Sequence, residues 1–145
     1  MPPLLLAHVF ATFAMTGVIW MVQVVHYPLF AQVGSEAFAS YHEAHTRLIT
    51  WIVLPLMCME AGTAALFAVQ PPRPLAGWAA WLGLALVSLI WAVTFFHSIP
   101  RHGLLAGAFD PRAHTELVAG NWLRTLSWTL RSGLMLWCLS RPPVS

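Results

Sequence analysis

The sequence contains no lysine, and charged residues of any kind are few. Only 8% of its 145 residues are charged, whereas a soluble domain carries about a quarter. No charged residue other than histidine occurs before Glu36. The basic residues are all arginines, and the net charge of +2 is too small and scattered for a nucleic-acid surface. We therefore expect no nucleic-acid partner and a lipid bilayer as the surrounding medium.

Cysteine is also scarce. Cys58 and Cys138 lie inside long apolar stretches, and no CxxC spacing occurs. Two interpretations are open: small apolar residues of a helical core, or a disulfide or redox pair. The absence of a paired spacing favours the first.

Long apolar runs dominate what is present. Crossing a bilayer core of about 30 Å takes about 20 apolar residues. Four segments reach that length, at residues 4–30, 48–69, 75–99 and 116–139. Ser35 is expected to cap a helix that continues into the second span. Short connections predict an all-α fold, an integral membrane antiparallel four-helix bundle that forms one domain over residues 1–145.

The arginines of the loops are divided between the two ends of this bundle, so they do not determine its orientation. A multi-pass protein of a bacterial inner membrane is the default expectation. Glycines at positions 17, 62, 83, 120 and 133 permit close helix contacts. This spacing is compatible with a homodimer.

Six of the seven histidines fall on one side of the predicted bundle, contributed by all four spans. Imidazole nitrogen suits zinc, copper or iron. The predicted ligands of a transition metal are His26, His42, His45, His97 and His114. Glu43 and Asp110 are predicted to support the ligands or to move protons. Ordinary polarity of a membrane interface is the alternative explanation.

Three charged residues lie inside predicted spans, where a charge is costly unless it faces the bundle interior and pairs. At about 1.5 Å per residue, Glu60 and Arg131 lie at similar depth. We predict that they interact, either as a clamp between helices or as part of a proton path. Arg124 is predicted to stabilise developing negative charge, and Arg124 and Asn121 are predicted to bind a cofactor.

Aromatic residues are frequent near the histidine side. They either wall a site for a flat apolar molecule or face lipid. These residues are Tyr27, Trp51, Trp91, Phe95, Phe96, Trp122 and Trp128.

The segments GVIWMVQVVHYPLF and NWLRTLSWTLR resemble the anthrone oxygenase-like family of small four-span membrane proteins. The positions that match its pattern are Pro28, Asn121, Arg124 and Thr125. The resemblance implies oxygenation of polycyclic aromatic phenols. A fainter resemblance links WMVQVVHYPLF to HemJ-type protoporphyrinogen oxidases and implies haem b, although their lysine-proline ending is absent here.

The leading prediction is therefore a metal-dependent membrane oxidoreductase or oxygenase that acts on an apolar small molecule. A haem b protein with two axial histidines is one alternative. A non-catalytic metal carrier or small transporter is another.

Overall fold

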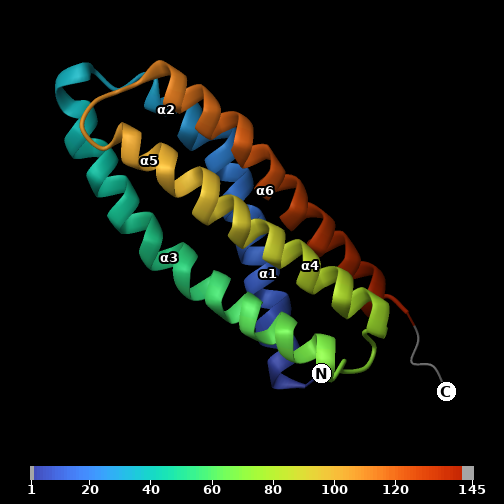
Figure 1. Cartoon of the computed structure of the whole chain (residues 1–145). Helices are drawn as coiled ribbons and strands as arrows, with labels where there is room; N and C mark the ends of the chain where they lie inside the picture. The colour runs from blue at the N-terminus through green and yellow to red at the C-terminus, as the bar shows by residue number, and fades with distance from the viewer. Residues whose placement is uncertain (1, 142–145) are drawn as a thin grey trace.

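The computed structural model describes residues 2–141, and every regular element among them is helical (Figure 1). The elements form four rods: α1 (Pro3–Met21), η1 (Val22–His26) and α2 (Tyr27–Phe30); α3 (Ser35–Val69); α4 (Gly77–Val93), η2 (Thr94–Ser98) and α5 (Ile99–Leu105); and α6 (Pro111–Leu139). The predicted all-α fold is confirmed for this part of the chain. Gly34, not Ser35, occupies the N-cap position of α3.

The first and third rods each contain a π-helical turn shortly before a proline. Pro28 and Pro100 have no backbone N–H, so neither can donate an α-helical hydrogen bond. The chain passes through η1 or η2 and resumes the α-helix with the proline in the first turn. Such π-turns often occur at functional sites. Here they end at His26 and just after His97.

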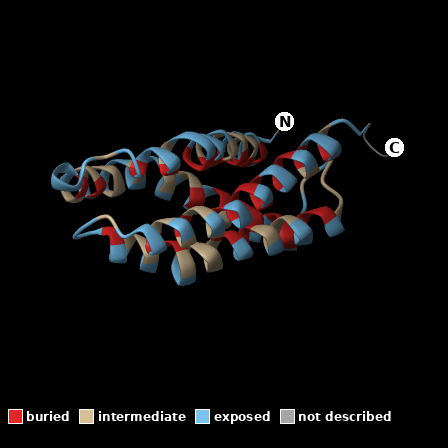
Figure 2. Cartoon of the chain, turned by 90° about the horizontal axis from the view of Figure 1, so that it is seen from above, coloured by how far each residue is buried: buried red, intermediate tan, exposed pale blue. Residues whose placement is uncertain are grey.

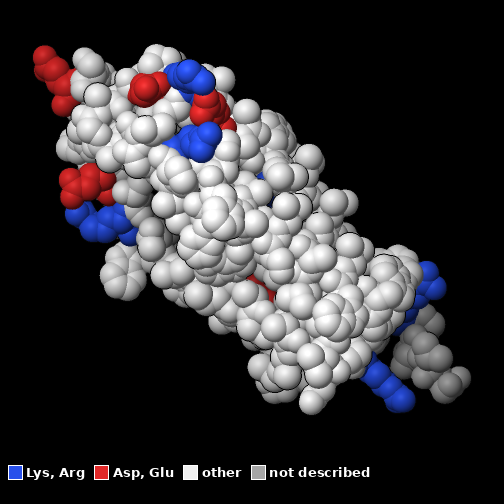
Figure 3. Space-filling view, in the orientation of Figure 1, with Lys and Arg blue, Asp and Glu red and all other residues white. Residues whose placement is uncertain are grey.

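The bundle exposes apolar side chains and buries polar ones. Phe96 is 82% exposed, whereas Glu60 and Asn121 are completely buried. Figure 2 shows the buried residues on the sides where the rods face one another. In Figure 3 the charged side chains gather at the two ends of the molecule, and the face between them is almost free of charge. An apolar exterior of this extent suits a lipid environment.

The first three rods are long and apolar enough to cross a membrane: Pro3–Phe30, Ser35–Val69 and Gly77–Leu105. The rod α6 does not meet this criterion by composition alone. Its polarity lies on its buried side, which includes Asn121, Arg124 and Arg131. Its outer side is apolar, and Leu130 there is 61% exposed.

The rods close into a ring at one end only. Both α1 and α4 pack against α3 and against α6. Beyond the π-turns, η2 and α5 stay against α6 but barely contact α3. The bundle is therefore splayed between α3 and α5, near the connection that leads into α3 (Figure 1).

Candidate functional site

Four histidines meet at the splayed end, and we call them the histidine cluster: His26, His42, His45 and His102. The Nε2 atom of His26 lies 2.7 Å from Nδ1 of His45. The Nε2 atom of His42 lies 3.0 Å from Nδ1 of His102. The ring centroids of His45 and His102 are 6.1 Å apart, so the two pairs are neighbours.

The cluster is assembled around one aromatic ring. Phe30 is fully buried, and its ring centroid lies 5.0 Å from that of His45 and 5.7 Å from that of His42. Its edge-to-face contacts fix the ring orientations. His42 and His45 reach the same partner because they are three residues apart on α3.

Tyr27 extends the cluster toward the bundle interior. Its hydroxyl lies 3.0 Å from Nε2 of His102, and the residue is only 3% exposed. Together with the contact between His42 and His102 it forms a continuous series, Tyr27–His102–His42. Each member is both a donor and an acceptor, so the series is able to pass a proton.

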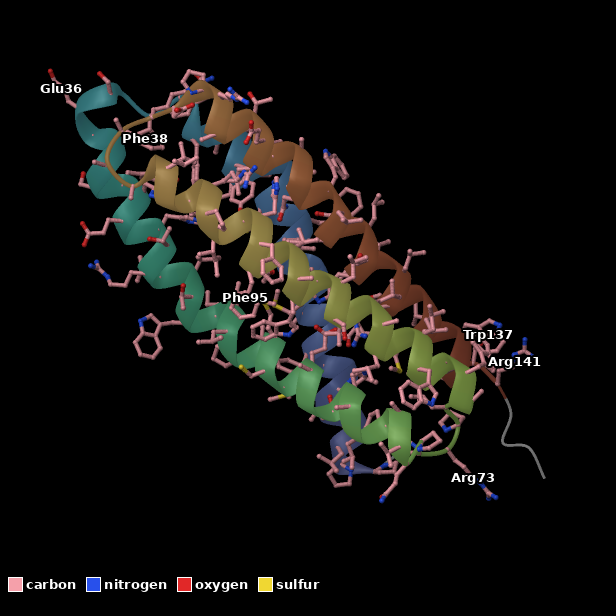
Figure 4. The ribbon with its side chains drawn as sticks, viewed as in Figure 1. Glu36, Phe38, Arg73, Phe95, Trp137 and Arg141 are labelled. Atoms are coloured by element: carbon pink, nitrogen blue, oxygen red, sulfur yellow. The ribbon has the colours of Figure 1, made fainter. Side chains whose placement is uncertain are left out.

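A cavity of about 240 Å³, the lateral chamber, lies beside this series and is bounded by all four rods. Its walls are mainly apolar, and its polar lining includes Tyr27, His45, His102 and Arg124. Leu54 of α3 and Phe95 of η2 line it while being 48% and 53% exposed (Figure 4 labels Phe95). The chamber therefore reaches the outer surface between α3 and the third rod.

A second cavity of about 500 Å³, the outer cavity, lies between α3 and α5. It is lined by His42, Glu43, Thr46 and His102, among others. His102 lines both cavities. The Tyr27–His102–His42 series thus links the lateral chamber to the outer cavity.

Three buried polar atoms lack a hydrogen-bond partner in residues 2–141: Trp91 Nε1, Ser98 Oγ and Arg124 Nε. All three residues line the lateral chamber. Buried polar groups are nearly always paired in folded proteins, so each exception needs an explanation. Two of these groups are N–H donors and the third is a hydroxyl, so together they offer hydrogen bonds to an acceptor in the chamber.

The predicted pair Asn121 and Arg124 are in contact with each other. Arg124 Nη1 donates to Asn121 Oδ1 at 3.0 Å, and Asn121 Nδ2 donates to Gln23 Oε1 at 2.8 Å. The guanidinium carbon of Arg124 lies 5.3 Å from the ring centroid of Trp128. Asn121 therefore positions Arg124 at the chamber wall.

Two of the predicted metal ligands lie outside the cluster. His97 Nε2 donates to the carbonyl oxygen of Glu116 at 2.9 Å. His114 Nε2 donates to the carbonyl oxygen of Tyr27 at 2.8 Å. His102 was not among the predicted ligands, yet it lies at the centre of the cluster. It lies beyond Ile99, where the third span was expected to end, so no sequence signal placed it on the chamber side.

The two predicted acids have different surroundings. Asp110 caps α6, where its Oδ1 accepts hydrogen bonds from the backbone N–H groups of Arg112 and Ala113. The side chain of Glu43 is 78% exposed and 4.0 Å from Arg47. Only Glu43 borders a cavity next to the cluster.

The predicted pair of Glu60 and Arg131 is present in the structure. Arg131 Nε donates to Glu60 Oε1 at 2.8 Å, with both side chains almost fully buried. Thr12 Oγ1 donates to the same oxygen at 2.9 Å, and Trp128 Nε1 donates to Glu60 Oε2 at 2.8 Å. Because both carboxylate oxygens have partners, drawn from α1 and α6, the arrangement favours the clamp interpretation.

The histidine cluster consists of two pairs and does not surround a common point. Within residues 2–141, no group of three or more His, Cys, Asp or Glu side chains has the arrangement of a metal site. An ion at the cluster would thus take two imidazoles from one pair and complete its ligands from water or substrate.

The aromatic residues divide between the two predicted roles. Tyr27, Trp91 and Phe95 line the chamber, whereas Trp51 and Phe96 face outward at 77% and 82% exposure. The resemblance to anthrone oxygenase-like and HemJ-type proteins stays a prediction from the sequence. No family model matches the chain, and no curated protein or solved structure matches it.

Proposed function

We propose that the protein is an integral membrane oxidoreductase that oxidises an apolar small molecule in the lateral chamber. One observation carries the proposal. The chamber combines apolar walls with Tyr27, His45, His102 and Arg124 in a single site that reaches the apolar outer surface. A cavity with mainly apolar walls and a few convergent polar groups is the usual form of a small-molecule site.

The membrane part of the proposal is an antiparallel four-span insertion, with a bacterial inner membrane as the location. Three rods are apolar enough to span. The fourth, α6, is proposed to span because Arg124 and Arg131, the charges within its apolar part, are buried, whereas Leu123, Leu126 and Leu130 are exposed. Polar side chains that face only other helices do not contact lipid, so they do not prevent a helix from spanning the membrane.

The Tyr27–His102–His42 series is proposed to carry the proton that the substrate loses. It begins in the chamber and ends at the outer cavity, beside Glu43. A general base within hydrogen-bond distance of the substrate is what such a step requires.

A redox-active ion is proposed at the His26–His45 pair. Two imidazole nitrogens on one tetrahedral ion lie about 3.3 Å apart, given metal–nitrogen bonds of about 2.0 Å. The observed 2.7 Å is the separation of a hydrogen-bonded pair, so an ion held there would replace the shared proton and widen the pair by roughly half an ångström. Copper or iron fits better than zinc, because zinc has no redox chemistry. Such an ion, held by His26 and His45, would supply electron transfer from the substrate to an oxidant such as dioxygen.

The metal proposal is tested by loading detergent-purified protein with copper or iron and measuring bound metal after dialysis. We expect stoichiometric bound metal and no Soret band. We expect the bound metal to be lost in His26→Gln, in His45→Gln and in the double variant that carries both changes. The matched control is His114→Gln, whose ring nitrogen is bonded to a backbone carbonyl. Retained metal in the double variant, or a Soret band in the native protein, would contradict the assignment.

Catalysis is tested separately by oxygen uptake with polycyclic aromatic phenols, the substrate class that the resemblance implies. We expect uptake only with metal-loaded protein. Metal binding without uptake of oxygen by any apolar substrate would favour the carrier instead.

A further inference from the structure

We propose that the ligand of the lateral chamber carries an anionic oxygen, best met by a carboxylate on an apolar body. This inference rests on the proposed function, because it specifies the substrate class of the same chamber. The observation behind it is a buried arginine, Arg124, that has no carboxylate within residues 2–141 as a counter-charge.

The two buried arginines of α6 differ in this respect. Arg131 is paired with the carboxylate of Glu60. Arg124 is only 6% exposed, yet no carboxylate among the described residues forms an ion pair with it. A buried charge without a counter-charge costs several kcal/mol. A ligand that brings a negative charge to the chamber would remove that cost.

The hydrogen bonds of Arg124 point to the same chemistry. Its Nη1 donates to Asn121, whereas its Nε is buried without a partner in the described part of the chain, and the residue lines the chamber. Guanidinium groups bind carboxylates through pairs of parallel N–H groups. Arg124 therefore keeps one buried N–H donor for a planar oxyanion, beside the Tyr27 hydroxyl that also interacts with its guanidinium.

Two further donors line the same cavity. Trp91 Nε1 and Ser98 Oγ are buried without partners. Both lie on the third rod, which packs against α6, and both can donate to an oxygen. All the unpartnered buried side-chain polar atoms of residues 2–141 thus belong to residues that line this one chamber.

The rest of the chamber selects an apolar body. Its lining from α1 and α3 includes Met15, Ile19, Val53 and Met57. At about 240 Å³ the cavity is smaller than the roughly 300–1,000 Å³ of most ligand pockets, so a compact molecule fits best.

The test compares three naphthalene probes by equilibrium dialysis in detergent, with empty micelles as the blank. These are 2-naphthoate, its neutral isostere 2-acetylnaphthalene, and naphthalene. Charge-assisted hydrogen bonds predict that 2-naphthoate binds roughly 10- to 100-fold more tightly than 2-acetylnaphthalene. Arg124→Gln should abolish that preference and weaken 2-naphthoate far more than naphthalene, which has no acceptor oxygen. Arg112→Gln, at an exposed arginine of the same helix, should retain it.

A second variant guards against misfolding of the Arg124 variant. Trp91→Phe keeps an aromatic wall but removes one hydrogen-bond donor. It should weaken the binding of 2-naphthoate roughly two- to tenfold. Equal binding of the charged and neutral probes, or a preference that persists in Arg124→Gln, would overturn the inference while leaving the chamber as a binding site. Failure of all three probes to bind would count against the chamber and the proposed function together.

Discussion

The ring of His97 occupies the space beside Gly120 that a side chain at position 120 would need. A Cβ atom built on Gly120 would overlap the imidazole of His97, whose Nε2 donates to the carbonyl of Glu116 one turn earlier on α6. The third rod and α6 therefore pack closely here, with the imidazole of His97 filling the space beside Gly120.

Gly120→Ala is expected to destabilise the protein because the histidine must move and lose its hydrogen bond. Overpacking of this kind costs about 1–3 kcal/mol. Thermal unfolding in detergent measures the effect. The matched control is Gly133→Ala on the same helix, where a Cβ meets nothing within 4 Å. That control should be neutral or stabilise by up to about 1 kcal/mol, and equal destabilisation by both changes would refute the close contact.

Glu60→Gln is expected to be strongly destabilising, since it leaves the charge of Arg131 buried and unpaired. Breaking a buried ion pair in this way costs about 3–5 kcal/mol. The double variant Glu60→Gln with Arg131→Met should recover much of the loss, because no unpaired charge is left. Denaturation in mild detergent provides the measurement, with Glu43→Gln as the exposed control. A double variant no more stable than Glu60→Gln alone would argue against the clamp.

Cysteine labelling tests the proposed insertion. Glu36 and Arg73 lie at opposite ends of the bundle (Figure 4), and Gly107 lies in the connection between α5 and α6, where a Cβ meets nothing within 4 Å. In sealed vesicles from a background lacking Cys58 and Cys138, an impermeant maleimide should label positions 36 and 107 from the same side and position 73 from the other. Labelling of all three from one side would contradict four spans.

The hydropathy of the sequence was enough to predict where the four helices lie. The free-energy cost of exposing apolar side chains to water or of burying charged ones in lipid is large, and it depends on composition. The same cost made Glu60 and Arg131 predictable as partners: two buried charges of opposite sign at one depth have few other arrangements. These predictions needed only the position of each residue along a rod.

The contacts of the histidines were harder to predict from the sequence, because they depend on how each rod is rotated about its axis. A π-turn changes that rotation, and one ends at His26 and another just after His97. His97 and His114 consequently reach backbone carbonyls. His102 was missed as a ligand because the third span was expected to end at Ile99, whereas α5 continues to Leu105. No spacing in the sequence reports the backbone rotation that a π-turn introduces.

The opening between α3 and the third rod has a kinetic consequence. In the proposed membrane-inserted state, a solute that enters there would be drawn from the acyl-chain phase, so its effective concentration would be its mole fraction in the membrane and not its molarity in the buffer. Adding empty vesicles at constant total substrate dilutes the substrate within the membrane phase. The turnover of such an enzyme should then fall, although nothing in the aqueous phase has changed.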